Sequence, residues 1–383
     1  MRILAILLCS ASLALSAASP VLVLSFDGLS AAQFTPRSMP RFWKLGLQGQ
    51  RGEGLPPFPA TTFNGHATLA TGCWPEHHGI VANGFVDPAL GFVRDAAQVE
   101  YLQREPLWVA ATRSGVRTAV YHWPCATGPW EGVSPWRMEV FQLDTPDRAA
   151  LAFSEAALKD GALLVMAYLS GTDTEGHLKG PASREVRHKL AALDQEVAPW
   201  VKRMLQRHPG LKVLLLADHG MAAMTRRIEV RPVLGPQARV IAHGGSAYIY
   251  PEAPLAPDAE SRLAALGLRV WHPATLPRSF HLGASPRIGS LVVEGPLGSW
   301  ISGAGTPTED AKERRGRLGA HGYDAADPRM HTWLVALGTG SHTPLPPTPL
   351  WDIAPTVAHW LDIKWTVEPD GRPAPTLTTV TAP

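Results

Sequence analysis

Short, continuous apolar runs recur along this chain of 383 residues, and segments of helical character separate them. An apolar run without polar alternation suits a strand that is buried on both faces of a sheet. The predicted strands cover residues 21–26, 118–122, 162–168, 212–217 and 331–337. The predicted helices cover residues 63–71, 106–114, 147–160, 183–208 and 350–361. The alternation predicts an α/β fold in which helices flank a mostly parallel central sheet.

Residues from about 226 to 317 differ from the rest of the chain in composition and in the spacing of their strand candidates. Proline and glycine are frequent there, and the two strand candidates, residues 247–250 and 288–294, are isolated. We interpret this segment as a small cap or insertion, so that residues 19–383 form one domain, as large α/β enzymes of this length often do. The proline-rich residues 368–383 are predicted to be a poorly ordered tail.

The first 18 residues have the layout of a cleavable secretory signal, with a charge at Arg2, an apolar core, and small residues at Ser16 and Ala18. Cleavage after Ala18 would export the rest of the chain to the periplasm or the medium. A membrane anchor is one alternative, although the apolar run is short for crossing a bilayer. A lipoprotein at Cys9 is another, although the preceding Leu8 is large. No later segment is predicted to span a membrane.

Removing the signal leaves two cysteines, Cys73 and Cys125. In an exported protein they could form one disulfide. The alternative is two buried free thiols. Both stay open, because the separation of the two Cα atoms is not visible in a sequence.

Charge argues against a nucleic-acid surface. The formal net charge is +2, and lysine and arginine are scattered along the chain. We interpret one local basic cluster as a solvated loop, with contact to an anionic substrate as the alternative. Its members are Lys312, Arg314, Arg315 and Arg317.

Polar side chains gather where the predicted strands end. In an open parallel sheet, ligands bind beyond the carboxyl ends of the strands. Any one of these side chains could simply cap a turn, but six carboxylate and imidazole groups at one edge point to a site. They are Asp27, Asp173, His177, Asp218, His219 and His321. Aspartate oxygen with histidine nitrogen suits zinc, and two such sets would make a two-metal site for displacement at phosphorus.

Such a site still needs a nucleophile. In residues 59–72, PATTFNGHATLATG, two threonines stand at the mouth of a predicted helix. One hydroxyl is enough for an N-cap, so the simpler interpretation is one cap and one filler residue. The other is that a threonine oxygen binds a metal and loses its proton, while helix N–H groups face an incoming phosphate oxygen.

The chain resembles the nucleotide pyrophosphatase/phosphodiesterase family within the alkaline phosphatase superfamily. Five stretches carry the resemblance in order, from residue 24 to 324: LSFDGL, FPATTFNGHATLATGCWPEHHGIVAN, LSGTDTEGHLKGP, LLLADHGM and GAHGYD. The resemblance implies an alkaline-phosphatase-like layered fold and two zinc ions per chain. It also implies cleavage of phosphodiester or pyrophosphate bonds of small nucleotides through a threonyl-phosphate intermediate, releasing a nucleoside monophosphate.

Roles for single residues follow from the same resemblance. Thr62, directly before a phenylalanine, would be the nucleophile, which leaves Thr61 a structural role. Asn83, with a backbone N–H near Phe63, would stabilise a non-bridging phosphate oxygen. The two zinc sites would be Asp173, His177 and His321 on one side, and Asp27, Thr62, Asp218 and His219 on the other.

Substrate preference is where the chain departs from the family. Phe63 and Tyr168 resemble positions that sandwich a nucleotide base, although both could equally pack the core. The family's TFPNH is TFNGH here, and the Asn64–Gly65 pair predicts a looser helix start. The family's EPD is GTD at residues 171–173, which is expected to alter the pocket edge near the leaving group.

Three alternatives remain beside a nucleotide diesterase. One is a phosphomonoesterase, which is disfavoured because no arginine is identifiable beside the nucleophile. Another is a phospholipid or choline phosphodiesterase of the same superfamily. The third, which is not an enzyme, is an exported protein that binds phosphate ligands through metals and does not hydrolyse them. A sulfatase is not among the three, because it would carry Cys or Ser in place of Thr62.

Overall fold

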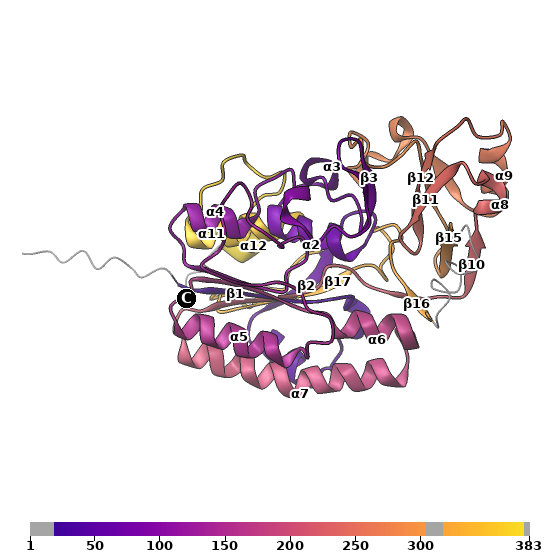
Figure 1. The fold of residues 1–383 in the computed structure, drawn as a ribbon. Helices are drawn as coiled ribbons and strands as arrows, with labels where there is room; N and C mark the ends of the chain where they lie inside the picture. The colour runs from indigo at the N-terminus through magenta and orange to yellow at the C-terminus, as the bar shows by residue number, and fades with distance from the viewer. Residues whose placement is uncertain (1–18, 304–316, 379–383) are drawn as a thin grey trace, which may run out of the picture.

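The computed structural model describes residues 19–303 and 317–378 (Figure 1). The predicted signal, residues 1–18, lies outside the described residues. So do residues 379–383 and Lys312, Arg314 and Arg315 of the basic cluster.

An eight-stranded sheet forms the centre of the molecule, in the order β18-β2-β17-β8-β1-β7-β5-β6. Neighbouring strands are parallel except at β17, which runs antiparallel to both β8 and β2. The prediction of a mostly parallel α/β sheet is confirmed. The strands are β1 (Val21–Phe26), β2 (Gln50–Leu55), β5 (Thr118–Tyr121), β6 (Arg137–Glu139), β7 (Leu164–Leu169), β8 (Lys212–Leu216), β17 (Thr332–Leu337) and β18 (Thr348–Pro349).

Helices cover both faces of this sheet, as Figure 1 shows with the sheet seen edge-on. One layer holds α2 (Thr62–Thr71), α4 (Leu107–Arg113), α11 (Ile353–Leu361) and α12 (Pro375–Thr378). The opposite layer holds α5 (Arg148–Lys159), α6 (Gly171–Lys179) and the long α7 (Arg184–Arg207), against which α1 (Pro40–Gly46) packs. Short helices α3 (Pro75–His78) and η5 (Leu350–Asp352) flank α2 and α11.

The central strands are buried on both faces because successive side chains point to opposite sides. In β1, Val21 and Val23 pack into the core beneath α2, α4 and α11. Leu22, Leu24 and Phe26 pack into the core beneath α5 and α7. This explains why the strand is an unbroken apolar run.

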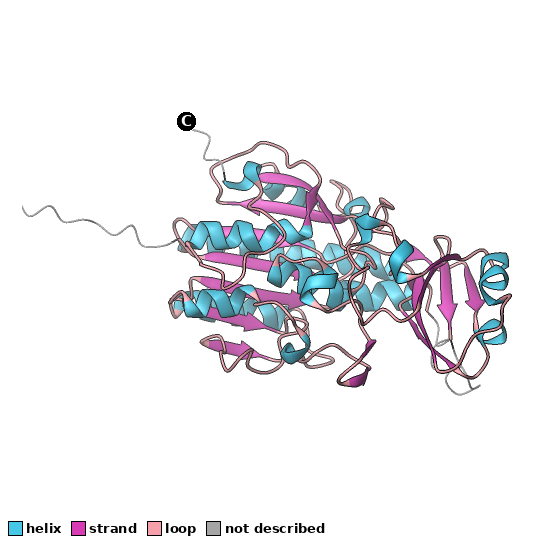
Figure 2. Ribbon diagram, turned by 90° about the horizontal axis from the view of Figure 1, so that it is seen from above, coloured by secondary structure: helices cyan, strands magenta, loops and turns pink. Residues whose placement is uncertain are grey.

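A smaller sheet lies at one side of the main sheet (Figures 1 and 2). One of its faces has its own core around Ile249, Leu263 and Val293, while Tyr248 and Val292 on the other face join the main core. Its strands in order are β11 (Ala238–Ala242), β12 (Ser246–Pro251), β14 (Leu291–Glu294) and β13 (Arg269–Trp271). Around it lie α8 (Arg231–Leu234), α9 (Ala259–Ala265), η3 (Pro273–Thr275), η4 (Arg278–Phe280) and the pair β10 (Arg226–Glu229) and β15 (Ser299–Ser302).

Two further strand pairs and two short helices complete the described elements. The hairpin of β3 (Phe85–Asp87) and β4 (Gly91–Val93) lies between the two sheets, and β9 (Ala222–Ala223) pairs with β16 (Gly319–Ala320). The short helices are η1 (Ala31–Gln33) and η2 (Val99–Tyr101). No helix in the described ranges combines the length and the apolar character that a membrane crossing requires.

The prediction of a poorly ordered tail is wrong for residues 368–378. The Asp370 carboxylate accepts a hydrogen bond from the Trp74 N–H at 2.9 Å and lies 2.8 Å from Nδ1 of His77. The N–H of Gly371 donates to the Gly72 carbonyl at 2.9 Å, and Leu377 of α12 is buried. These contacts fix a segment whose proline content suggested disorder.

Both cysteines are buried free thiols. Of the two possibilities that the sequence left open, the structure therefore has the thiols and not the disulfide. Burial raises the pKa of Cys73 to about 11 and that of Cys125 well above its ordinary value, so both stay protonated and unreactive.

Candidate active site

The topology brings the predicted site residues to one edge of the main sheet. Asp27 directly follows β1, and Asp218 follows β8 by one residue. The carboxyl end of β7 leads into α6, and that of β2 leads through residues 56–61 into α2. His321 precedes β17, and because β17 is antiparallel, its starting end lies at this same edge.

Asp173, His177 and His321 form one potential metal-binding group. Asp173 and His177 are four residues apart on α6, so they share a helix face. The Asp173 carboxylate lies 3.4 Å from Nε2 of His177 and 3.8 Å from Nε2 of His321. In both groups, the ligand atoms lie within 4.8 Å of one another.

Asp27, Asp218 and His219 form the second group, which is buried. Nε2 of His219 lies 3.4 Å from the Asp27 carboxylate and 3.2 Å from that of Asp218. Oγ1 of Thr62 lies 3.2 Å from the same Nε2 and 3.5 Å from Oδ1 of Asp27. The hydroxyl of Thr62 thus adjoins this group.

The three histidines have their ring orientation fixed by the backbone. Nδ1 lies 2.8 Å from the Gly319 carbonyl in His177, 2.9 Å from the Gly220 carbonyl in His219, and 3.1 Å from the Ala60 carbonyl in His321. A carbonyl oxygen only accepts, so each Nδ1 carries the proton and each Nε2 presents a lone pair to the site. Burial, with the charges of His219 and His177, holds the pKa of His321 well below its ordinary value.

The carboxylates are crowded and incompletely satisfied. Burial, together with the charges of Asp218 and Asp173, raises the pKa of Asp27 well above its ordinary value. Burial also opposes ionisation of Asp218, but the neighbouring His219 and His66 outweigh it and bring its pKa to about 2. Oδ1 of Asp173 and Oδ2 of Asp218 are buried and have no hydrogen-bond partner among the described residues. Carboxylate oxygens without a hydrogen-bond donor, beside unprotonated imidazole nitrogens, fit zinc.

Two other side chains form hydrogen bonds with Asp27 at the carboxyl end of β1. The Tyr168 hydroxyl donates to Oδ2 of Asp27, and the Thr172 hydroxyl donates to the Asp27 carbonyl at 2.5 Å. Gly28 adopts φ +67° and its N–H donates to Oδ1 of Asp218 at 3.2 Å. Thr172, in the GTD departure from the family, lines neither of the two cavities at the site. It ties α6 to the end of β1 instead of shaping the pocket edge.

The two threonines at the start of α2 differ in every contact. Thr62 is the first residue of the helix and its hydroxyl faces the second group. Thr61 occupies the N-cap position, but its hydroxyl makes no capping bond and is buried without a hydrogen-bond partner among the described residues. The simple capping interpretation therefore fails for Thr61.

The Asn64–Gly65 pair does not loosen the helix start, contrary to the prediction. Asn64 is fully buried, and its Nδ2 donates to the carbonyls of Phe58 at 3.1 Å and Pro59 at 2.9 Å. A Cβ on Gly65 would lie 2.8 Å from the Asp218 carbonyl oxygen. Glycine thus lets α2 contact the end of β8, and the asparagine ties the helix to the preceding loop.

Asn83 lies beside the start of α2 in a defined orientation. The N–H of Phe63 donates to its Oδ1 at 3.0 Å. This N–H was expected to face a phosphate oxygen, and the structure uses it to orient the amide instead. Nδ2 is the donor of this amide, and Asn83 lines both cavities of the site.

Two cavities meet at Thr62, Asn83 and Asp173. One, of about 250 Å³, is also lined by Phe63, Tyr168 and Phe141. The other, of about 360 Å³, is lined by a different set: His177, Ala242, His243, Gly244, Trp300, Arg317 and His321. The site can therefore hold groups on two sides of Thr62.

Three residues of the site were missed by the sequence analysis or given another role. His66 is buried, with Nδ1 2.8 Å from the Thr62 carbonyl and 3.4 Å from Oδ2 of Asp218. Phe141, in a loop after β6, is 46% exposed beside Tyr168. Arg317, expected in a solvated loop, shares a cavity with Thr62. That position weakens the argument against monoesters, which relied on the absence of such an arginine.

Comparison with known proteins matches residues 21–324 to the family described as type I phosphodiesterase/nucleotide pyrophosphatase. An uncharacterised pyrophosphatase/phosphodiesterase of Schizosaccharomyces pombe is 30% identical over 354 residues, which covers 84% of this chain and 71% of that protein. Venom phosphodiesterase 2 of Crotalus adamanteus is 26% identical, covering 84% of this chain and 42% of its own. The chain thus spans less than half of the venom enzyme.

Solved structures share the fold. Murine ectonucleotide pyrophosphatase/phosphodiesterase 5 superposes with a TM-score of 0.81 at 24% identity, covering 92% of this chain and 97% of that one. Its inactive threonine-to-alanine variant, in complex with AMP, gives 0.83. The human counterpart gives 0.81 at 23% identity.

Proposed function

The chain belongs to the type I phosphodiesterase/nucleotide pyrophosphatase family, and from that premise we propose that it hydrolyses phosphodiester or pyrophosphate bonds of small nucleotides, releasing a nucleoside monophosphate. The observation that carries the proposal is the position of the Thr62 hydroxyl, 3.2 Å from Nε2 of His219 and in a cavity shared with His177 and His321.

Two zinc ions are the proposed cofactors. Asp173, His177 and His321 would hold one, and Asp27, Asp218 and His219, with Thr62, the other. Zinc bound there would supply Lewis-acid stabilisation of charge on the reacting oxygens. Two buried carboxylate oxygens without a hydrogen-bond donor, Oδ1 of Asp173 and Oδ2 of Asp218, and the unprotonated Nε2 atoms of the three histidines support this assignment.

Thr62 is the proposed nucleophile. Its hydroxyl loses its proton to solvent, and Oγ1 bonds to phosphorus in line with the bond to the leaving oxygen. That bond breaks, and the leaving oxygen departs with the electron pair and takes up a proton from solvent. Water then cleaves the threonyl-phosphate ester, which releases the nucleoside monophosphate and restores the hydroxyl. The position of Thr62 at the start of α2 holds Oγ1 in one place, because His66 and Gly65 fix the helix against Asp218.

Asn83 is proposed to bind a non-bridging phosphate oxygen. With its Oδ1 engaged by Phe63, its Nδ2 is the group free to donate to the developing charge.

The nucleoside is proposed to occupy the cavity of about 250 Å³. Aromatic faces stack on bases, and Phe63 and the exposed Phe141 offer such faces there. Tyr168 lines the same cavity but is 7% exposed, with its hydroxyl bonded to Asp27, so it would form the wall at the base rather than an open face. The AMP bound by the murine fold neighbour supports a nucleotide ligand.

A pair of substrates tests the function. Purified protein with zinc is assayed with p-nitrophenyl thymidine 5′-phosphate and with p-nitrophenyl phosphate, and glycerophosphocholine is added as a third substrate. We expect the nucleoside diester to have the highest kcat/KM. Faster turnover of the monoester or of glycerophosphocholine would contradict the proposal.

The Thr62→Ala variant distinguishes an enzyme from a protein that only binds phosphate ligands. We expect it to retain zinc and to lose at least about a thousandfold in kcat, because the nucleophile is removed. A wild-type protein that binds these ligands but turns over none of them would instead be a metal-dependent binding protein.

Export is proposed from the signal layout of residues 1–18 and is consistent with relatives named as venom and ectonucleotide enzymes. Amino-terminal sequencing of protein from a secreting host should then begin at Ser19. A mature protein that keeps Met1 would contradict export by this signal.

A further inference from the structure

The main sheet has an open edge at β6, the last strand in its order. Among the described residues, β6 pairs only with β5, in parallel, and Met138 lies opposite Val120. The N–H of His122 donates to the carbonyl of Glu139 at 2.7 Å, so the backbone of Glu139 faces β5. Because backbone groups alternate in direction along a strand, the N–H and C=O of Met138 point away from the sheet. This residue can therefore pair with another strand.

Exposed apolar side chains flank this edge. Trp136 is 43% exposed, Val140 45% and Leu143 79%, and every residue from 139 to 144 is exposed. Monomeric proteins seldom gather exposed apolar side chains in one place unless that place serves an interaction. An open strand edge with such neighbours is a template for pairing with another chain. The charges of β6 then decide which chain it can pair with.

The sequence of this edge is complementary to itself. Residues 136–140 read WRMEV. When two copies pair antiparallel with Met138 opposite Met138, Arg137 of each copy lies opposite Glu139 of the other. The tryptophan at one end lies opposite the valine at the other end. Directly opposed side chains share a face of the sheet, with Cβ atoms about 5 Å apart, so the opposite charges attract and the apolar side chains make contact.

The charged side chains of β6 are able to form these pairs. Glu139 is exposed and forms no ion pair in the part of the chain that the structure describes. Nη2 of Arg137 lies 2.7 Å from Oδ2 of Asp160, and its guanidinium carbon lies 4.5 Å from the centroid of the Trp136 ring. These contacts orient the arginine, and a guanidinium has more N–H donors than one carboxylate uses. A second carboxylate can therefore bind beside the first.

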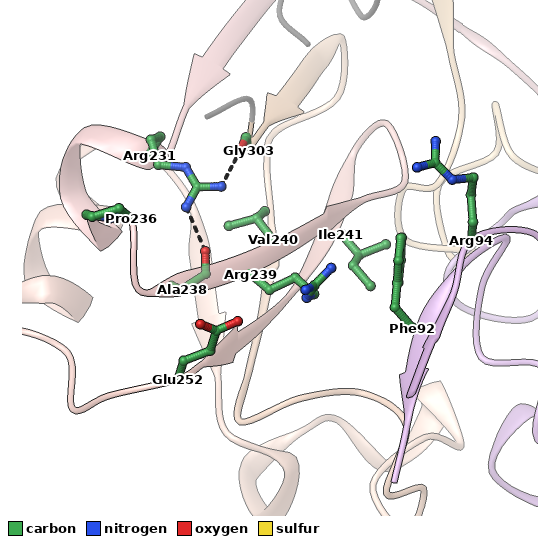
Figure 3. Close-up of a pocket in the computed structure, with 10 residues that line it drawn as sticks. All are labelled: Phe92, Arg94, Arg231, Pro236, Ala238, Arg239, Val240, Ile241, Glu252 and Gly303. Carbon is green, nitrogen blue, oxygen red and sulfur yellow. Dashed lines mark hydrogen bonds between the residues drawn. The ribbon is translucent and has the colours of Figure 1, made fainter. Parts of the chain in front are cut away.

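Two other open edges lack this pattern. β11 lies at the edge of the smaller sheet, beside a cavity of about 540 Å³ that is lined by Arg94, Arg231 and Arg239 (Figure 3). Of the described residues that line this cavity, only Glu252 carries a carboxylate, so two copies that met there would bring like charges together. β18, at the other edge of the main sheet, has two residues, and one of them, Pro349, has no N–H to donate.

We propose that a second copy of this chain docks at β6, in a dimer with twofold symmetry whose two edge strands pair antiparallel about Met138. The symmetry makes each contact occur twice, so both arginine–glutamate pairs form. Three residues in each strand bury too little surface for a stable dimer, which takes about 800 Å² per partner. Trp136, Val140 and Leu143 supply further contact area. The pairing joins the two central sheets into one.

The oligomeric state provides the test. Sedimentation velocity of the purified protein should show a dimer between about 1 and 100 µM. Glu139→Arg places like charges opposite each other at both pairs, so we expect the Kd of the dimer to rise at least about tenfold. A monomer throughout this range, or an unchanged Kd in the variant, would overturn the proposal.

Reversal of both charges tests the register. The double variant Arg137→Glu, Glu139→Arg restores opposite charges across the axis, so we expect its Kd to return to within about threefold of wild type. Glu196→Arg is the matched control, because Glu196 is exposed on α7 and forms no ion pair within the described ranges. Its Kd should not change. A double variant as weak as Glu139→Arg, or an equal loss in the control, would contradict the pairing.

A disulfide tests the centre of the interface. Cα atoms of a hydrogen-bonded antiparallel pair lie about 5.5 Å apart, which a disulfide can span. Because Cys73 and Cys125 are buried, the new thiol of Met138→Cys is the accessible one. We expect a disulfide-linked dimer of this variant after mild oxidation, and none of Glu196→Cys. Absence of the linked dimer in Met138→Cys would overturn a twofold axis at this residue.

Discussion

Two adjacent threonines at the start of α2 have opposite surroundings. Thr62 faces a histidine nitrogen and a carboxylate, while Thr61 is buried with a hydroxyl that has no partner in the described part of the chain. A buried hydroxyl without a hydrogen bond lowers stability, since its bonds to water are lost on folding. The pair therefore offers a comparison between the hydroxyl proposed to react and a hydroxyl without a partner one residue away.

Thr61→Val should separate the two roles. Valine keeps the shape and removes the unsatisfied hydroxyl, so we expect the free energy of unfolding to rise by about 1 kcal/mol. Turnover should stay within about twofold of wild type, because Thr61 is not part of the reacting group. Urea unfolding and the nitrophenyl assay check both values, with Thr62→Val as the inactive counterpart. Loss of turnover in Thr61→Val would show that the hydroxyls are not divided in this way.

Gly65 is the residue that sets the distance between α2 and β8. In Gly65→Ala the new methyl would meet the backbone of Asp218, which cannot move without displacing a site residue. We expect a loss of about 1–3 kcal/mol in unfolding free energy from overpacking. We also expect about a hundredfold loss of kcat/KM from displacement of Thr62.

Gly46→Ala is the control for that substitution. Gly46 lies at the end of α1, where a Cβ would make only ordinary contacts, the nearest at 3.5 Å. The same chemical change should there be neutral or stabilising by up to about 1 kcal/mol, with turnover unchanged. Equal effects of the two substitutions would argue against a packing role for Gly65.

At the scale of elements, the short helix α3 depends on an uncharged histidine. His78 is fully buried, its Nδ1 accepts from the Ile80 N–H at 3.1 Å, and Nε2 lies 3.0 Å from the Thr68 hydroxyl. Burial, with the nearby charges of His77 and Arg287, lowers the pKa of His78 to about 3. This histidine links α2 to the segment that carries Asn83.

Acid should destabilise this link. The folded pKa of His78 lies below the unfolded value of about 6.5, so the unfolded state takes up the proton first and stability falls as pH drops below about 6.5. Between pH 7 and pH 5, the expected contribution is a loss of about 2 kcal/mol. Urea unfolding at both pH values should show a correspondingly smaller loss in His78→Gln. An identical loss in the variant would contradict this account.

Elements also show what the sequence could reveal. The central parallel strands were predictable because strands buried on both faces are continuous apolar runs. β2, with the sequence QRGEGL, was not predicted, since it has no such run. A Cβ on Gly52 would lie 2.6 Å from the Leu345 carbonyl oxygen, and a Cβ on Gly54 would lie 2.4 Å from the Thr332 hydroxyl. The glycines of β2 are therefore required by segments that are distant in the sequence. The reversed direction of β17 likewise follows from its neighbours and not from its own residues.

The site, like the sheet, was predictable where its own residues form a recognisable pattern and not where neighbouring segments determine the contacts. Aspartates that follow strands stand out in the sequence, and the resemblance assigned their partners. The carbonyls that orient the histidines carry no side-chain signal. Phe141 and Arg317 lie in irregular segments without periodicity. His66 could have been suspected only from its position one helical turn after Thr62.

At the scale of the whole molecule, the two potential metal-binding groups bring together side chains from segments that are far apart in the sequence. Three buried or partly buried carboxylates converge from the ends of β1, β8 and β7, and their mutual repulsion is one cause of the raised pKa of Asp27. Bound cations would offset this repulsion. Stability and activity should therefore depend on metal together.

Removal of metal tests this dependence. We expect dialysis against a chelator to abolish turnover and to lower Tm by several degrees, because ligands that bind only the folded state stabilise it by mass action. Zinc should restore both, at about two ions per chain. Measured stoichiometry together with thermal unfolding checks the prediction, and full activity in metal-free protein would contradict it.

The place of β2 in the sheet has a consequence for the order in which the protein is made. Within the described residues, β2 pairs with β17 and β18 and with no other strand, although it emerges from the ribosome some 280 residues before them, counted from Gly54 to Thr332. The strand that leads to Thr62 can therefore join the sheet only after β17 or β18 has been made. His321 arrives at nearly the same moment. A chain that stops before β17 holds Asp27, Asp173, His177, Asp218 and His219 but not the sheet partner of β2, so we expect Thr62 to be fixed in place only after β17 has been made.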